Sequence, residues 1–302
     1  MESLNIHKSF SQYFVISEDD EAWGIHILNC GASIIPRGAV FPQRSHPDNY
    51  YFNWHSGRVL REYQIIYLYR GRGEFDSHES GKVELKEGSV ILIFPGVWHR
   101  YKPLADEEWQ TYWVGFNGEL ARKIMDNLHI LPENPVQELG YQKKITQIFQ
   151  QIFEVGHAEF SGYQQVLSGE VVKLAGWLHA LKRKAEFGDY DADAIIRQAR
   201  IIIMNSPDDI SIQTVADELN IGYSRFRKLF KEYTGMAPGQ YQIELKLKRA
   251  INLLYDKNKP IKEIAMESGF SSPYYFSRIF KKKLGCSPLY FRNKLFDSSN
   301  KV

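Results

Sequence analysis

Cysteine is scarce in this sequence, and long apolar runs are missing from it. The chain has 302 residues and two cysteines, Cys30 and Cys286, which fall in regions of different composition. Two such residues form neither a disulfide framework nor a metal-ligand cluster, as is usual in a reducing cytoplasm. No segment approaches the roughly 20 apolar residues that cross a membrane, and no basic-then-apolar start suggests a signal peptide. We therefore expect a cytoplasmic protein that has no membrane partner.

The common signatures of enzymes are also absent. The sequence has no Gly-rich phosphate loop and no nucleophile elbow. It has no His-x-His pair either, because His55 is followed by Ser56 and Gly57. A bound metal needs three or four converging imidazole or carboxylate ligands, and nothing in the spacing of His46 and Glu62 requires that they act as such. We therefore expect no catalytic residues, no metal and no cofactor.

Charge is distributed unevenly along the chain, although the net charge is only +2. Residues 195–296 carry 18 Lys and Arg against 9 Asp and Glu, a net charge of +9. Residues 1–194 carry 19 against 26, a net charge of −7. Most runs of like charge are solvated helix faces. A basic region this distinct from the rest of its chain is instead typical of a nucleic-acid-binding domain.

The basic region contains the same helical unit twice. At a shift of 49 residues, the apolar and small positions of one copy match those of the other: Ile212 with Ile261, Val215 with Ile264, and Ala216 with Ala265. After one inserted residue, the match continues at a shift of 50: Phe226 with Phe276, Phe230 with Phe280, Gly235 with Gly285, and Pro238 with Pro288. Agreement over this length indicates an internal duplication.

Each copy is typical of a helix-turn-helix unit. Apolar residues at 212, 215, 216 and 219 form one face of a short helix, and Ser211 is a suitable N-cap for it. Asn220 and Gly269 follow the first helix of each copy, and both residue types tolerate a left-handed backbone. The second helix of such a unit can lie in a DNA major groove. Its outward positions are our candidate DNA-binding residues: Ser224, Arg225, Arg227, Lys228 and Lys231 in the first copy, and Tyr274, Ser277, Arg278 and Lys281 in the second.

The second copy resembles the signature of AraC/XylS-type bacterial transcription regulators. The matching residues are Ala265, Gly269-Phe270, Phe276, Arg278, Phe280-Lys281, Gly285, Pro288 and Phe291-Arg292. The resemblance implies a DNA-binding domain of seven helices over residues 195–296, with a linker helix from Pro238 to about Tyr255 between two recognition helices. The positions that match the DNA-facing ones of the family are Ser224, Arg227 and Lys228, and Tyr274, Ser277 and Arg278. It further implies promoter DNA and RNA polymerase as partners.

Residues 1–117 are predicted to form β-structure. Short runs such as Tyr63–Tyr69 and Val90–Phe94 are rich in β-branched and aromatic residues and are separated by turn signals. The stretch Gly88–His99 resembles the second motif of cupin barrels, which occur as effector domains in many AraC-type regulators. We therefore predict a multi-domain α+β fold, in which an N-terminal antiparallel, cupin-like β-barrel precedes an all-α domain with two helix-turn-helix units.

An aromatic and polar segment of this barrel is the candidate effector site. Rings that pack on C–H faces and polar groups that meet hydroxyls are what a sugar-sized ligand needs, which makes a sugar the expected effector. The same aromatic residues can equally be barrel core. The candidate effector-binding residues are Tyr51, Trp54, Arg58, Glu62, Trp98, His99 and Tyr101.

Residues 118–186 have a helical period. One stripe consists of Ile145, Ile148, Phe149, Ile152 and Phe153, and a second of Leu167, Val171, Leu174, Leu178 and Leu181. Such stripes are usually core. In a helical pair attached to a barrel, however, we expect one stripe to lack a partner in its own chain and to form a homodimer interface, and the family resemblance implies the same. Residues 187–194 are predicted to be the linker to the DNA-binding domain.

The hypothesis that combines these features is a sequence-specific transcription regulator, expected to be an activator, that a small-molecule effector controls. The residues themselves leave activation or repression open. One alternative is a cupin enzyme with a nucleic-acid-binding appendage, which the missing metal set disfavours. Another is an architectural DNA-binding protein without an effector, which leaves the acidic, folded N-terminal region unexplained.

Overall fold

The computed structural model describes residues 8–39, 54–104, 107–187, 192–206 and 210–298. The chain divides into two compact units, Met1–Gly188 and Asp189–Val302. Among the described residues, the first unit contains all the strands and four helices, and the regular structure of the second unit is entirely helical. Within the described ranges, no helix combines the length and the apolar character that a membrane span requires.

The strands of the first unit form two antiparallel sheets. One sheet has the order β1-β2-β9-β4-β7-β10 and the other the order β3-β8-β5-β6. The bounds in the first sheet are Phe10–Tyr13, His26–Ile35, Trp109–Asn117, Tyr63–Arg70, Ser89–Ile93 and Val136–Glu138. Those in the second are Arg58–Val59, Trp98–Pro103, Gly73–Ser77 and Gly81–Leu85. The predicted antiparallel, cupin-like β-structure is confirmed, although hydrogen bonds among the described residues do not close it into one continuous barrel.

The six-stranded sheet is buried on both faces. In β4, Ile66 and Leu68 lie in a core that also contains Phe75 and Leu85 of the smaller sheet, whereas Ile65 and Tyr67 lie in a core with the helices. In β7, Val90 and Leu92 face the helices, and Ile91 and Ile93 face the smaller sheet. Both faces of this strand are buried, so apolar and polar residues do not alternate along it. We refer to the face toward the smaller sheet as the inner face.

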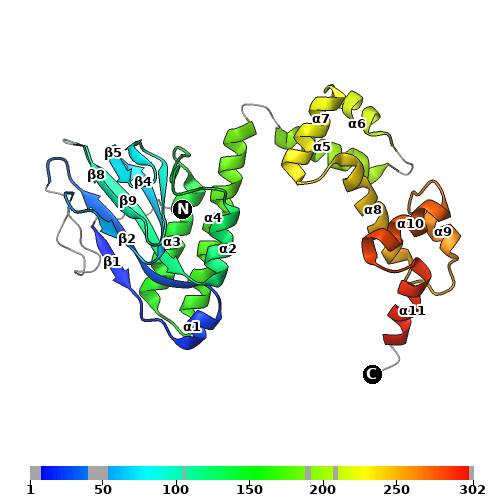
Figure 1. Cartoon of the computed structure of the whole chain (residues 1–302), viewed down its shortest axis with the longest axis horizontal. Helices are drawn as coiled ribbons and strands as arrows, with labels where there is room; N and C mark the ends of the chain where they lie inside the picture. The colour runs from blue at the N-terminus through cyan, green and yellow to red at the C-terminus, as the bar shows by residue number, and fades with distance from the viewer. Residues whose placement is uncertain (1–7, 40–53, 105–106, 188–191, 207–209, 299–302) are drawn as a thin grey trace. The chain divides into compact units, whose positions relative to one another are not determined.

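Helices cover the other face, as Figure 1 shows. They are α2 (Glu119–Asn127), α3 (Lys143–Ala158) and α4 (Tyr163–Phe187), while the short α1 (Glu18–Ala22) precedes β2. A polar clip anchors α4: the Gln164 side-chain amide donates to the Ile27 carbonyl and accepts from the Ile27 N–H, both at 3.0 Å. This exchange satisfies backbone groups beside the irregularity in the β2–β9 pairing.

The two helical stripes were predicted correctly as helix faces, but the expectation that one of them lacks a partner in its own chain was wrong. Phe149 stacks on Tyr67 of β4, and Phe153 packs edge-on against Tyr112 of β9. The α4 residues Leu167, Val171, Leu174 and Leu178 belong to the same core. Both stripes therefore pack within the chain, because the sheet presents an apolar face wide enough for two helices.

The second unit has seven helices in its described residues, as the family resemblance implies. They are α5 (Ala192–Asn205), α6 (Ile212–Glu218), α7 (Tyr223–Thr234), α8 (Pro238–Leu253), α9 (Ile261–Glu267), α10 (Pro273–Leu284) and α11 (Pro288–Ser298). The Ser211 hydroxyl accepts from the Thr214 N–H at 3.0 Å, so the predicted N-cap is confirmed. Asn220 and Gly269 have φ values of 51° and 82°, so both turns are left-handed as expected.

Helix α8 joins two separate cores in this unit. Tyr241 and Leu245, in its first half, pack with Phe226 and Phe230 of α7. Leu247 and Ala250 in its second half, and Leu254 just after its end, pack with α9, α10 and α11. Side chains add to these contacts: Gln242 donates to the Ile210 carbonyl at 2.9 Å, and Glu244 pairs with Lys283 of α10 at 2.5 Å. The helix thereby fixes the position of one helix-turn-helix unit relative to the other.

Candidate effector pocket and nucleic-acid interface

The inner face of the six-stranded sheet carries a polar row across four strands. The pairing register places Tyr13, Asn29, Gly115 and Gln64 side by side on β1, β2, β9 and β4. The Asn29 and Gln64 side-chain amides each donate to Glu62 Oε1, at 2.7 and 2.8 Å. Asn29, Glu62 and Gln64 are all buried. A carboxylate that receives two amide donors keeps a fixed orientation inside the sheet.

Two glycines make room for this arrangement. A Cβ at Gly115 would collide with the Glu62 carboxylate and the Asn29 amide. In the next row of the same face, a Cβ at Gly31 would collide with the Trp113 ring. Glycine at these two positions lets the polar groups meet over β9 and lets the indole lie against β2. The result is a flat aromatic surface beside a fixed carboxylate.

The smaller sheet brings three of the predicted effector residues together. Arg58 Nε donates to His99 Nε2 at 3.2 Å, and Arg58 Nη2 donates to the Tyr101 hydroxyl at 3.4 Å. His99 is buried, and Tyr101 packs on the core between the sheets. These side chains therefore point inward from β3 and β8.

His99 is a neutral group. Burial is the main cause that lowers its pKa to about 3, and the neighbouring Arg58 charge lowers it further, while the hydrogen bond to Val97 opposes the shift. Because Arg58 only donates, His99 Nε2 accepts, and the ring proton lies on Nδ1, which is 3.1 Å from the Val97 carbonyl. Among the described residues, no three His, Cys, Asp or Glu side chains are grouped as metal ligands.

Tyr13 lies in the same row as Asn29, on the inner face of the six-stranded sheet. Burial chiefly raises the pKa of its hydroxyl, a hydrogen bond with Ser11 opposes this, and the charges of Arg58, Glu62 and Tyr101 also act on it. These groups therefore lie within electrostatic reach of one phenol. Together they provide donors, an acceptor-only carboxylate and aromatic faces at one end of the sheets, which is the set that binds a polyhydroxylated molecule.

Two other predicted effector residues, Trp54 and Trp98, lie elsewhere. Tyr51 falls outside the described residues. Trp54 and Trp98 contact Arg100, and Arg100 alternates with the inward-pointing His99 and Tyr101 along β8, so these tryptophans lie on the outer face of the smaller sheet. The structure thus groups Arg58, His99 and Tyr101, and it places Glu62 beside Asn29 and Gln64 of the six-stranded sheet. Trp54 and Trp98 lie on the outer face of the smaller sheet instead. The sequence did not single out four neighbouring residues: Tyr13, Asn29, Gln64 and Trp113. For Asn29 and Gln64, the available signal was a polar side chain within an otherwise apolar strand.

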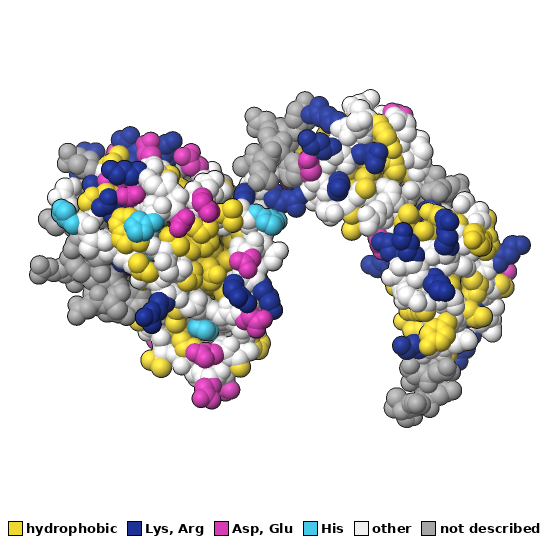
Figure 2. All heavy atoms as spheres, viewed as in Figure 1, with side chains coloured by type: hydrophobic (Ala, Val, Ile, Leu, Met, Phe, Trp, Pro, Cys, Tyr) yellow, Lys and Arg dark blue, Asp and Glu magenta, His cyan; other side chains and the backbone are white. Residues whose placement is uncertain are grey.

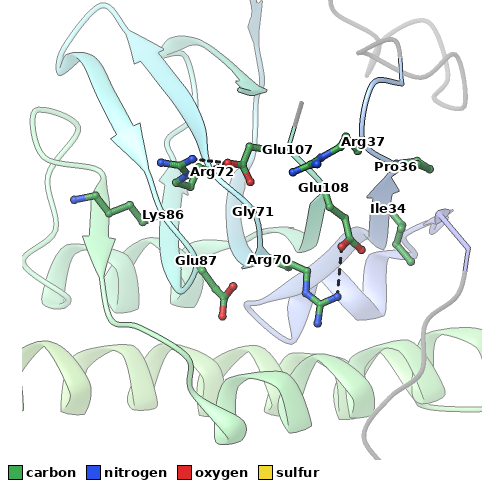
Figure 3. A pocket seen from close by; sticks show the side chains of 10 residues that line it. All are labelled: Ile34, Pro36, Arg37, Arg70, Gly71, Arg72, Lys86, Glu87, Glu107 and Glu108. Atoms are coloured by element: carbon green, nitrogen blue, oxygen red, sulfur yellow. Dashed lines mark hydrogen bonds and ion pairs between the residues drawn. The ribbon is translucent and has the colours of Figure 1, made fainter. Parts of the chain in front are cut away.

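A wide hollow of about 840 Å³ lies at the opposite end of β2, β4 and β9, and Figure 3 shows its lining. Its charged residues largely neutralise one another: Arg72 pairs with Glu107 at 2.5 Å, and Arg70 pairs with Glu108 at 3.5 Å. None of the predicted effector residues lines it. The hollow is open to solvent, and besides its ion-paired residues it is lined by Ile34 and Pro36.

The candidate DNA-binding residues lie on the outer sides of α7 and α10. Phe226 and Phe230 are fully buried beneath α7, and Phe276 and Phe280 beneath α10. The exposed residues are Ser224, Arg225, Arg227, Lys228 and Lys231 on α7, and Tyr274, Arg278 and Lys281 on α10, with Ser277 half-buried. Figure 2 shows many Lys and Arg side chains and few carboxylates on the visible face of this unit.

Aromatic rings hold two of these cations in place. The Arg227 guanidinium lies 5.4 Å from the centre of the Tyr223 ring, and that of Arg278 lies 5.5 Å from the Tyr275 ring. Lys228 is 3.9 Å from Glu232 but its side chain is 78% exposed, so this pair leaves it accessible. Two exposed, cation-bearing helices, each second in a helix-turn-helix unit, form a surface suited to DNA.

Two family models match the chain. Residues 37–165 match the AraC-like ligand binding domain, and residues 215–294 match a helix-turn-helix domain. The chain is 23% identical over 237 residues to the MmsAB operon regulatory protein of Pseudomonas aeruginosa, covering 78% of this chain and 76% of that protein. It is 24% identical over 253 residues to the raffinose operon transcriptional regulatory protein RafR of Pediococcus pentosaceus, covering 81% and 89%. It is 26% identical over 248 residues to the lactose operon transcription activator of Staphylococcus xylosus, covering 80% and 88%.

Proposed function

Because the chain belongs to the AraC family of transcription regulators, with a ligand-binding domain ahead of a helix-turn-helix domain, we propose that it activates transcription in response to a sugar bound between the two sheets of its first unit. The observation that carries this proposal is the inner-face cluster. Glu62 is held as an acceptor by Asn29 and Gln64, while Arg58 offers donors from the facing sheet. The names of the raffinose and lactose operon regulators support a sugar.

The chemistry of the cluster favours a neutral sugar. Glu62 accepts hydrogen bonds from hydroxyls, Arg58 donates to ring or hydroxyl oxygens, and the Trp113 ring offers a surface for C–H groups. One cation and one carboxylate face the same space, so neither an anionic nor a cationic ligand gains a net charge attraction there. Trp113 thereby takes the stacking role that the sequence had assigned to Trp54 and Trp98.

Promoter recognition is assigned to α7 and α10. Each helix enters one major groove, so one protomer covers an asymmetric site whose two elements lie about 34 Å apart. Residues 223–228 of α7 determine the choice of promoter. Arg227, Lys228 and Arg278 are the base-reading cations, while Arg225, Lys231 and Lys281 contact phosphates.

We further propose that the protein is a homodimer in the cytoplasm that acts on RNA polymerase at its promoters. Since both predicted stripes are buried, the interface is assigned to the outward face of α4. Val166 and Val172 are 43% and 39% exposed on this helix. Gly169 and Gly176 lie between and beyond them and have open space around their Cα atoms. A second copy of α4 would cover these apolar and small residues.

A sugar panel tests the central part of this proposal. Full-length protein is heated with raffinose, lactose, arabinose and other neutral sugars, and unfolding is followed by tryptophan fluorescence. All six tryptophans, at positions 23, 54, 98, 109, 113 and 177, lie in the first unit, so the signal reports that unit alone. A sugar at 100 times its dissociation constant should add about 2.7 kcal/mol to stability.

Substitutions at the proposed site test where the sugar binds, and one substitution far from it is the control. Glu62→Gln and Arg58→Lys should abolish the shift, while Arg72→Lys, at the opposite end of the sheets, should retain it. A sugar shift that survives both pocket substitutions would place the sensor elsewhere, and a panel without any shift would remove the sugar from the proposal.

A further inference from the structure

The outer face of the smaller sheet carries a stacked cluster that the effector pocket does not use. The Trp98 ring stacks on His78, with ring centres 4.7 Å apart and planes inclined by 24°. The Arg100 guanidinium lies 4.4 Å from the centre of the Trp54 ring and 5.2 Å from that of Trp98. We refer to Trp54, Asp76, Trp98 and Arg100 as the outer clamp. The Arg100 guanidinium therefore lies close to two indoles.

Hydrogen bonds fix this guanidinium in its plane. Arg100 Nε and Nη2 donate to Asp76 Oδ2 at 3.0 and 2.7 Å. Arg100 Nη1 donates to the Trp54 carbonyl at 2.8 Å. The side chains of Arg100 and Asp76 are only 21% and 13% exposed, so water screens this pair less than a surface ion pair. All three guanidinium nitrogens therefore have protein acceptors.

The clamp holds the turn that precedes Arg58. Besides the bond from Arg100 to the Trp54 carbonyl, Trp98 Nε1 donates to the Ser56 carbonyl at 2.7 Å. Gly57 then adopts a φ of 61°, and a Cβ there would overlap the Trp98 ring. Only glycine fits such a position without strain. The backbone just before Arg58 is thus attached to β8 at two carbonyls.

Arg58 belongs to a short strand. It begins β3, which has two residues, and the register pairs Arg58 with His99 and Val59 with Trp98. Because side chains alternate along β8, Trp98 and Arg100 hold the turn from outside while His99 and Tyr101 receive Arg58 inside. One strand therefore serves both the clamp and the pocket.

We propose that Arg100, together with Asp76, Trp54 and Trp98, is a positioning residue for the effector site, which orients Arg58 through the 54–57 turn without contacting the effector. This inference rests on the proposed role of Arg58 in binding a sugar. It assigns to Trp54 and Trp98 a function other than the ligand contact expected from the sequence. The affinity for the effector then depends in part on side chains on the outer face of the smaller sheet.

Arg100→Lys in the full chain is the test substitution. Lysine retains the positive charge beside Asp76, but it lacks the planar fork that bonds Asp76 and the Trp54 carbonyl together. Arg58 then samples several orientations, and the sugar must order it on binding. We expect affinity for the sugar that shifts the wild type, with raffinose and lactose as first probes, to fall roughly 2- to 10-fold, the cost of immobilising one long side chain.

A second readout does not depend on any sugar. In protein with ¹⁵N-labelled histidine, the His99 Nε2 resonance reports the hydrogen bond from Arg58, and it is identified by its loss in His99→Gln. We expect Arg100→Lys and Asp76→Asn to shift this resonance in the same direction as Arg58→Lys. Arg72→Lys replaces another carboxylate-paired arginine far from Arg58, and it should leave the resonance unchanged.

The outcomes separate the two proposals. If Arg100→Lys and Asp76→Asn, folded as judged by tryptophan fluorescence, leave the His99 resonance at its wild-type position, the clamp does not position Arg58 and the inference is overturned. If the resonance shifts while sugar affinity is unchanged, the positioning role in effector binding is likewise rejected. If no sugar binds the wild type, the proposed function fails, whereas the His99 resonance still decides whether the clamp orients Arg58.

Discussion

Acidification should destabilise the first unit through His99. The pKa of this buried imidazole is lowered from 6.5 to about 3 by burial and by the Arg58 charge. As pH falls below 6.5, the histidine of the unfolded chain takes up a proton, but the folded one stays neutral until pH approaches 3. The unfolded state therefore binds more protons in this window, and stability falls as pH falls.

The size of the effect follows from the two pKa values. Between pH 7 and pH 5, linkage predicts that His99 alone removes about 2 kcal/mol of unfolding free energy. The perturbation is His99→Gln, whose amide can donate to the Val97 carbonyl and accept from Arg58 but does not titrate. Wild type should lose this amount relative to the variant over the same pH range.

The assay is urea denaturation of the full chain at several pH values, followed by tryptophan fluorescence, which reports the first unit. Comparing wild type with His99→Gln cancels the contributions of the other titrating groups. Parallel pH profiles for the two proteins would refute the reasoning, because they would mean that His99 is protonated to the same extent in the folded and unfolded chain.

Two further predictions concern the interfaces. Ile148→Asp places a charge in the core beneath the sheet and should destabilise the first unit by more than about 3 kcal/mol. Val172→Asp should stay folded, and sedimentation should show that it dissociates the dimer. An intact Val172→Asp dimer would move the interface away from α4. Lys228→Ala and Arg278→Ala should each weaken binding to the preferred DNA site by about 1–3 kcal/mol and relax sequence preference at one position. An equal loss on every DNA sequence would identify that residue as a phosphate contact.

The helix-turn-helix units could be predicted in detail because their signals are local. Ser211 and Ser272 cap helices that begin at the next residue, and Asn220 and Gly269 occupy the left-handed turns that their residue types favour. The inner and outer faces of α7 and α10 follow from a helical period that needs no knowledge of tertiary partners.

The proposed effector site was only partly predictable, because strand pairing decides which side chains meet there. Trp98 and His99 are neighbours in the sequence, yet β-structure places them on opposite faces of one strand. Glu62 acquires its partners from β2 and β4, so the Asn29 contact depends on a register that the local sequence does not reveal. The partner of the helical stripes was missed for a related reason. An apolar run such as 90–94 indicates a strand without showing that both of its faces are covered.

Sequencing the genomic DNA fragments that the purified full chain retains, with and without the sugar that stabilises it, tests both DNA reading by α7 and α10 and control by the sugar. We expect one shared, asymmetric motif with two elements about one helical turn apart, and a change in fragment recovery when the sugar is added. Retention without any shared motif would contradict DNA reading by α7 and α10. Recovery that is identical with and without the sugar would contradict control by the pocket between the sheets.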